Sequence, residues 1–415
     1  MGRLISILWT LQLCVLVSCQ RTELDSPANL ELYSQLRRGI FRSYVNRISN
    51  KGSGSDVFPN TQKRVPPTVP FPCNVTGGRS PQVPTSVNRL RPGDIDMIGS
   101  MGDSLTAGNA IFAIKPLELI VENRGVAATS GGQANWRTYA TLSNFLKEFN
   151  PKLFGYALGD SFTAHPASQF SVAEAGAMSR DMPFMAQYLV NRIKKDPRVD
   201  MKNHWKMITI LVGSNDFCTN LCSAPSPWSI VDDHERDLVK TLRILRDNLP
   251  RTYVSLIVTP HLKAFVDTRK GRSETKCYFY TMLECTCLLG LKYLRNRPLY
   301  YEVMSRFQKV EEDVAGYPEF HKEDFTVEVL PGIKRVVVPL AKDGYTDLSY
   351  MAHDCFHLAQ KAHALFGTVL WNNLLEPYGN KSTNWYWMSE KFLCPSPEKP
   401  YLATRENSRM GNNLS

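Results

Sequence analysis

Short apolar runs alternate with longer amphipathic segments along most of the chain. The apolar runs predict buried strands, and they cover residues 95–98, 117–121, 207–212, 253–258 and 336–340. Apolar residues three and four positions apart predict helices over residues 27–48, 138–149, 168–195, 232–248, 298–315 and 357–375. Strands that are apolar on both faces are typical of parallel sheets. The alternation therefore predicts an α/β fold, doubly wound in three layers around a mostly parallel central sheet.

Residues 1–19 have the pattern of an export signal. Arg3 precedes an apolar stretch and a small-residue cleavage site, so we expect a signal peptide and a secreted, extracellular protein. The alternatives are myristoylation at Gly2 and a bacterial lipoprotein cleaved before Cys19. No later run of about 18 apolar residues is present and the end of the chain is polar, so neither a transmembrane span nor an anchor signal is expected.

The same patterns predict the domain organisation. After the signal peptide, residues 20–92 are expected to hold one helix and an extended segment rich in Pro, Gly and Ser. Residues 93–395 form the main domain, and residues 396–415 form a polar tail. Three glycosylation sequons begin at Asn74, Asn380 and Asn413.

The composition of the 415-residue chain is that of a globular protein, with 43% hydrophobic and 21% charged residues. Its formal net charge of +10 is not concentrated in any basic run. Nucleic-acid binding is therefore not expected, whereas peripheral contact with an anionic lipid surface is compatible with this charge.

Ten cysteines are present, and two of them lie in the predicted signal peptide. The other eight are an even number in an exported chain, which predicts disulfide bonds without fixing their pairing. Zinc binding is the alternative, but the spacings match no known zinc finger. The eight are Cys73, Cys218, Cys222, Cys277, Cys285, Cys287, Cys355 and Cys394.

The main chemical signal lies in residues 94–110, where an apolar strand runs into Gly-Asp-Ser and then into small and polar residues. We expect the hydroxyl of Ser104 at the carboxyl edge of a sheet and at the start of a helix. Free N–H groups and the helix dipole favour negative charge there, so Ser104 is placed as a nucleophile would be. The alternative is that Asp103 or Ser104 only caps the helix.

Three other segments follow predicted strands or precede the last helix. The paired glycines Gly131 and Gly132 lie in a loop where backbone N–H groups can approach a ligand. Asn215 follows an apolar strand and can direct its amide at an oxyanion. Asp354 and His357 are three positions apart, so the carboxylate can fix the tautomer of the imidazole. Each segment alone is equally typical of an ordinary loop.

In this order, the blocks around Ser104, Gly132, Asn215 and His357 resemble the GDSL or SGNH hydrolase superfamily. Residues 86–109, 144–151, 354–358, 371–377 and 394–395 resemble phospholipase B more closely, and the likeness extends over residues 27–405. The resemblance implies a flavodoxin-like α/β fold without a metal or other cofactor. It also implies a secreted esterase that cleaves acyl esters of phospholipids and lysophospholipids.

By position, the resemblance implies that Ser104 is the nucleophile, His357 the general base and acid, and Asp354 the residue that orients it. The implied oxyanion-hole donors are the N–H of Ser104, the N–H of Gly132 (or of Gly131, one position earlier) and the side chain of Asn215. Gln133 stands where the family more often has an acidic residue.

Two other functions fit the same residues. One is a GDSL carboxylesterase or acetylesterase acting on a different ester, since the loops that shape the pocket decide the substrate. The other is a secreted lipid-binding protein without activity, against which the intact set of Ser, His and Asp argues. The chain has no Gly-x-Ser-x-Gly elbow, which argues against the α/β-hydrolase family.

Overall fold

The computed structural model describes residues 60–267 and 275–412. All of them belong to one compact unit, Phe58–Ser415. The predicted signal peptide, the predicted helix over residues 27–48 and the sequon at Asn413 lie outside the described residues.

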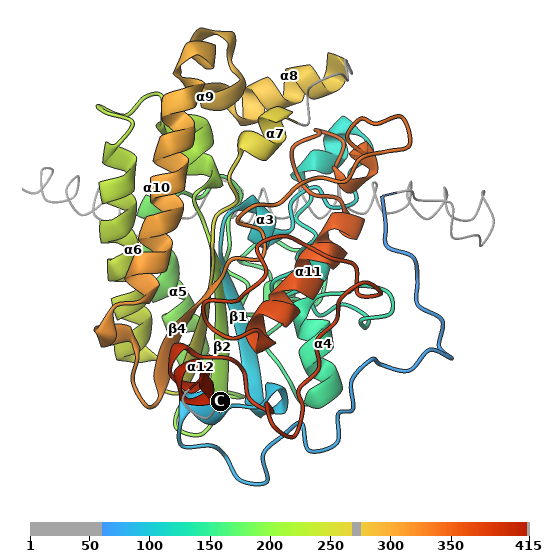
Figure 1. Ribbon diagram of the computed structural model, residues 1–415, viewed down its shortest axis with the longest axis vertical. Helices are drawn as coiled ribbons and strands as arrows, with labels where there is room; N and C mark the ends of the chain where they lie inside the picture. The colour runs from blue at the N-terminus through green and yellow to red at the C-terminus, as the bar shows by residue number, and fades with distance from the viewer. Residues whose placement is uncertain (1–59, 268–274, 413–415) are drawn as a thin grey trace, which may run out of the picture. The chain divides into compact units, whose positions relative to one another are not determined.

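Four parallel strands form the sheet in the described part of the chain (Figure 1). They are β1 (Ile95–Gly102), β2 (Trp205–Leu211), β3 (Thr252–Ile257) and β4 (Phe325–Leu330), hydrogen-bonded in that order. Every residue of β2, β3 and β4 is buried, as expected of a parallel sheet with both faces covered. The predicted parallel α/β fold is confirmed.

Helices cover both faces of this sheet (Figure 1). One face carries α5 (Met182–Lys195), α6 (Ser229–Asn248) and α10 (Arg297–Ala315), and the other carries α4 (Leu142–Phe149) and α11 (Gln360–Leu375). Side chains of β2 alternate between the two layers: Ile208 and Ile210 join the first hydrophobic cluster, and Met207 and Leu211 join the second. The three-layer architecture follows from this alternation.

The predicted strand over residues 336–340 is wrong. These residues form no strand of the sheet, and Leu340 is 66% exposed. The last strand is β4, in which Thr326 and Glu328 are buried among apolar residues. Thr326 Oγ1 donates to Glu328 Oε1 (2.8 Å), and the N–H of Arg405 donates to the same carboxylate (3.0 Å). These partners satisfy the buried carboxyl, and a hydropathy pattern does not reveal them.

Residues 117–121 are not a strand either. Pro116–Ile120 form the 3₁₀ helix η5, and Leu117 is 68% exposed. The proline opens the helix, and the Glu118 carboxylate closes its first turn by accepting the N–H of Lys115 (3.1 Å). The proline and the Glu118 hydrogen bond therefore favour a 3₁₀ turn here, although the run is apolar enough to predict a strand.

The predicted helices over residues 232–248 and 298–315 correspond to α6 and α10, but three others begin later than predicted. For example, α4 begins at Leu142 because Thr141 accepts the N–H of Asn144 (3.2 Å) as its N-cap.

The remaining short elements are η3 (Val87–Arg89), η4 (Pro92–Asp94), η6 (Arg124–Val126), η7 (Pro166–Ser168), η8 (Ser179–Asp181), η9 (Asp216–Asn220), η11 (Pro318–Phe320), η12 (Leu348–Tyr350) and α12 (Arg405–Asn412).

Short helices between β3 and α10 were not predicted. They are α7 (Lys263–Asp267), α8 (Thr275–Glu284), α9 (Thr286–Leu289) and η10 (Leu291–Asn296). Figure 1 shows α7, α8 and α9 beyond the carboxyl ends of the strands, at the end of the sheet where α3 (Ser104–Ala107) begins. We call α8, α9 and η10 the cap.

All eight cysteines that were expected to form disulfide bonds do so, which makes the zinc alternative wrong. Cys73–Cys394 joins the extended N-terminal segment to the end of the domain. The other bonds all involve the cap, and they are Cys218–Cys285, Cys222–Cys287 and Cys277–Cys355. In the ranges that the structure describes, no helix combines the length and the apolar character needed to cross a bilayer.

Removing the Cys73–Cys394 bond should lower the free energy of unfolding. Replacing both residues by Ser opens a cross-link between positions 321 residues apart, and losing a native bridge costs roughly 2–5 kcal/mol. Urea unfolding followed by tryptophan fluorescence measures this loss. An unfolding free energy equal to that of the parent protein would contradict the prediction.

Candidate active site

Gly102 and Asp103 turn the chain sharply from β1 into α3. Gly102 has a φ of +147°, and a Cβ atom there would lie 2.0 Å from the carbonyl oxygen of Leu211 on β2. The N–H of Asp103 donates to that same oxygen (3.1 Å). Only glycine fits this position, and the pairing of the two strands therefore fixes where Ser104 begins the helix.

The helix is capped by Asp103 rather than by Ser104. Asp103 Oδ1 accepts the N–H of Leu105 (3.0 Å), so the hydroxyl of Ser104 is not used for the cap. As the first residue of α3, Ser104 has an N–H with no preceding helical turn to accept it. The serine side chain thus begins a helix at the carboxyl edge of the sheet, where an anion is favoured.

The turn of residues 354–357 brings Asp354 and His357 together. His357 Nδ1 lies 2.6 Å from Asp354 Oδ2, and both side chains are buried. Asp354 Oδ1 accepts the N–H groups of Phe356 (2.9 Å) and His357 (3.0 Å). Cys355, between them, takes a φ of +57°, which closes the turn. The carboxylate is therefore held in place by the backbone of its own turn.

The two side chains shift each other's pKa toward an ion pair. Burial alone would raise the pKa of Asp354, but the charge and hydrogen bond of His357 bring it below the usual value. Burial alone would lower the pKa of His357, but the charge and hydrogen bond of Asp354 raise it overall. Because Nδ1 is held by the carboxylate, Nε2 is the ring nitrogen that remains for proton transfer.

Electrostatics link this pair to the start of α3. Burial raises the pKa of Asp103 to about 7, and the positive charge of His357 opposes this rise. Among the described residues, no hydrogen bond joins Ser104 Oγ to His357. Catalytic hydrogen bonds are often long without substrate and tighten when it binds. The imidazole thus lies within electrostatic reach of the residue next to Ser104.

Asn215 follows β2, the strand that pairs with β1. Gly213 has a φ of +134° and turns the chain at the end of the strand. Asn215 Nδ2 donates to the carbonyl oxygen of Ala177 (2.9 Å), which orients the amide and leaves its second hydrogen for another acceptor. Ser104 and Asn215 therefore come from the carboxyl ends of adjacent parallel strands.

Asp216 is a buried acid that the sequence did not single out. Its carboxylate accepts the N–H of Ser179 (3.0 Å), and burial raises its pKa to about 7. Its charge also raises the pKa of Asp103. One buried carboxyl thus lies beside Ser104 and another beside Asn215.

The glycine loop is closely packed. The N–H of Gly131 donates to Ala127 O and the N–H of Gly132 donates to Ala157 O, both at 2.9 Å. A Cβ atom on Gly132 would lie 2.0 Å from the ring of Tyr156, so glycine is needed here for packing. An oxyanion donor at Gly132 or Gly131 stays a prediction, and both N–H groups already have a backbone acceptor.

A third carboxylate lies close to the Asp354–His357 pair and was not expected. Ligand atoms of Glu284, Asp354 and His357 all lie within 4.8 Å of one another. Glu284 ends α8, and burial raises its pKa while the charge of His357 opposes the rise. The Cys277–Cys355 bond holds α8 against the 354–357 turn. Only this long-range contact brings Glu284 to the site, and no local motif could have indicated it.

These three side chains are also the one group of three or more His, Cys, Asp or Glu with converging ligand atoms in the described ranges. A histidine and two carboxylates are donors that zinc uses. However, Asp354 already accepts three hydrogen bonds, one of them from His357 Nδ1. Because His357 Nδ1 is held by Asp354, Nε2 is the nitrogen of this ring that remains for a proton or a metal ion.

Comparison with known proteins places the chain in a described family. Residues 98–370 match the family described as GDSL-like Lipase/Acylhydrolase. The chain is also similar to the protein named "Phospholipase B1, membrane-associated" from Homo sapiens, with 34% identity over 338 residues, and from Rattus norvegicus, with 34% identity over 351 residues. These matches cover 80% and 81% of this chain but 22% and 23% of the relatives, so the chain spans less than a quarter of their length.

Glu284→Gln should lower the pKa of His357. The negative charge of Glu284 favours the protonated imidazole, so its removal moves the titration of the ring to lower pH. NMR titration of the His357 imidazole measures the shift directly. Glu302→Gln, at an exposed position of α10, is the matched control. An unchanged pKa, or a higher one, would contradict the assignment of Glu284 to this site.

Proposed function

Because the chain belongs to the family of GDSL-like lipases and acylhydrolases, we propose that it is a serine esterase with Ser104 as nucleophile and His357 and Asp354 as its base and orienting acid. The observation that carries the proposal is the 2.6 Å contact between His357 Nδ1 and Asp354 Oδ2. Such a contact fixes the imidazole tautomer with Nε2 directed away from the carboxylate.

In the proposed mechanism, Ser104 Oγ attacks the ester carbonyl carbon while His357 Nε2 accepts the hydroxyl proton. The tetrahedral oxyanion accepts hydrogen bonds from the N–H of Ser104 and from the side-chain amide of Asn215. The carbon–oxygen bond to the leaving alcohol then breaks, and His357 returns the proton to that alcohol. This leaves an acyl-enzyme on Ser104.

Deacylation repeats these steps with water. His357 removes a proton from the water, which attacks the acyl-enzyme carbonyl, and the free acid leaves as Ser104 regains its proton. Asp354 stays ionised throughout, because its pKa lies below the usual value. Its negative charge stabilises the imidazolium that forms in each half-reaction. The chain's own residues therefore account for both half-reactions.

We propose phospholipids and lysophospholipids as the substrates. The support is the 34% identity to membrane-associated phospholipase B1 over 338 residues. Release into an extracellular compartment is part of the proposal and is supported by the four disulfide bonds.

Ser104→Ala should abolish hydrolysis while leaving the fold intact. Losing the nucleophile of such a triad reduces turnover by at least about a thousandfold. Fatty-acid release from phosphatidylcholine and lysophosphatidylcholine, together with hydrolysis of short p-nitrophenyl esters, measures it. Ser389→Ala, at an exposed position, is the control.

The outcomes separate the candidate functions. Serine-dependent release from the lipids supports the proposal. Activity on the short esters alone would keep the triad and replace the substrate class with that of a carboxylesterase. Turnover retained in the Ser104→Ala protein would refute the nucleophile, and no activity on any ester would favour a lipid-binding protein.

Asn215→Ala should lower kcat by about 10²–10³ with a smaller effect on KM, because an oxyanion-hole donor acts mainly in the transition state. Asn215→Asp should lower kcat as well, since a carboxylate cannot donate. Steady-state kinetics on one ester measures both variants beside Asn203→Ala at an exposed site. A loss of less than about tenfold would remove Asn215 from the proposed oxyanion hole.

A further inference from the structure

The helix α8 turns its polar side toward the protein. Cys277, Thr281 and Glu284 are three and four positions apart and therefore share one helix face. Cys277 is bonded to Cys355 in the 354–357 turn, and a carboxylate oxygen of Glu284 lies within 4.8 Å of a ring nitrogen of His357. Thr281 is the one buried residue of this helix.

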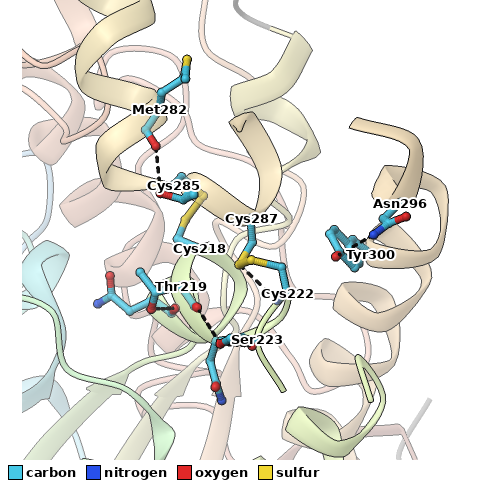
Figure 2. Close-up of a disulfide and its surroundings, with 12 residues drawn as sticks. Cys218, Thr219, Cys222, Ser223, Met282, Cys285, Cys287, Asn296 and Tyr300 are labelled. Atoms are coloured by element: carbon cyan, nitrogen blue, oxygen red, sulfur yellow. Dashed lines mark hydrogen bonds between the residues drawn. A yellow bond between two sulfur atoms is a disulfide. The ribbon is translucent and has the colours of Figure 1, made fainter. Parts of the chain in front are cut away.

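The exposed surface of α8 is mostly apolar. Tyr278, Phe279 and Leu283 are 48%, 59% and 63% exposed. An amphipathic helix on a protein surface normally directs such side chains inward. Disulfide bonds at Cys277 and at Cys285 hold both ends of α8 (Figure 2 shows the second). The helix therefore cannot rotate its apolar side into the core while these bonds are intact.

A second apolar segment contacts the same turn. The N–H of His353 donates to Ala113 O (3.0 Å), and its ring lies 5.6 Å from the ring of Tyr280 on α8. The segment after Ala113 carries three exposed apolar side chains, Ile114 (40%), Leu117 (68%) and Ile120 (47%). Exposed apolar side chains thus lie on two segments that both contact the residue before Asp354.

The exposed charged residues of the segment after Ala113 and of the whole cap are all basic. Over residues 114–120 and 275–296 they are Lys115, Lys276, Lys292 and Arg295. The acidic residues there, Glu118 and Glu284, are buried and half-buried. Apolar side chains enter a lipid interface, and nearby lysines and arginines are attracted to anionic headgroups. The charge and the apolar character together are complementary to an anionic lipid surface.

We propose that this protein binds the surface of an anionic phospholipid bilayer through a docking face made of Ile114, Leu117, Ile120, Tyr278, Phe279 and Leu283. The inference rests on the proposed lipid-ester hydrolysis. A bilayer docked on this face lies near the 354–357 turn, which carries the proposed base His357. The disulfide bonds hold α8 in the binding orientation, so docking requires no opening of the cap.

The test is co-sedimentation of the Ser104→Ala protein with vesicles, which removes turnover from the measurement. Vesicles of equal parts phosphatidylcholine and phosphatidylserine should bind more tightly than phosphatidylcholine alone, and added NaCl should weaken binding. Phe279→Ser/Leu283→Ser should weaken binding at least about tenfold, and so should Leu117→Ser/Ile120→Ser. The control is Phe184→Ser/Tyr188→Ser, at exposed positions on α5 (39% and 38%), which should bind as the parent does.

Binding unchanged by both docking-face variants, or absent from both kinds of vesicle, would overturn the proposal. Light scattering that shows a dimer dissociated by these variants, without vesicle binding, would identify a second copy as the occupant and overturn it too. Failure of the proposed function is distinguishable, because it appears as a lack of Ser104-dependent ester hydrolysis. Vesicle binding by the Ser104→Ala protein does not depend on that reaction.

Discussion

The parallel pairing of β1 with β2 is the constraint on which the candidate site depends. Gly102 pairs in register with Leu211, and Asp103 extends the pairing by donating to the Leu211 carbonyl. Because residue 102 has no side chain, the chain enters α3 at once and Ser104 begins the helix beside the end of β2. The same edge carries Asn215. Backbone pairing therefore positions two residues of the candidate site before any side-chain contact does.

A second constraint is covalent, and it joins segments that are distant in the sequence. Cys277 bonds to Cys355, which lies between Asp354 and His357. Cys218–Cys285 (Figure 2) ties the beginning of α9 to η9, the helix that follows Asn215. The cap is thus fixed to both segments that border the site. This arrangement explains why Glu284 lies near the imidazole and why an apolar helix face stays exposed.

The buried acids of this region make the stability of the fold depend on pH. The pKa values of Asp103 and Asp216 are raised from 3.8 to about 7, so the folded state binds more protons than the unfolded chain between these values. Their contribution to stability is therefore present at low pH and is lost as the pH rises toward about 7. The buried His234 and His363, with pKa values lowered from 6.5 to about 3, act in the opposite direction below pH 6.5.

By itself, the sequence determined the α/β fold, the first three strands, and Ser104, Asn215, Asp354 and His357 as candidates for the site. These signals are local, because an apolar run, a Gly-Asp-Ser turn and two residues three positions apart can be recognised within a few residues. Only the tertiary structure showed that the last strand is β4 and not the segment 336–340. It also decided how the cysteines pair and brought Glu284 to the candidate site. It also showed that the Gly132 N–H already has an acceptor. Each of these depends on contacts between segments far apart in the chain, and neither hydropathy nor spacing encodes such contacts.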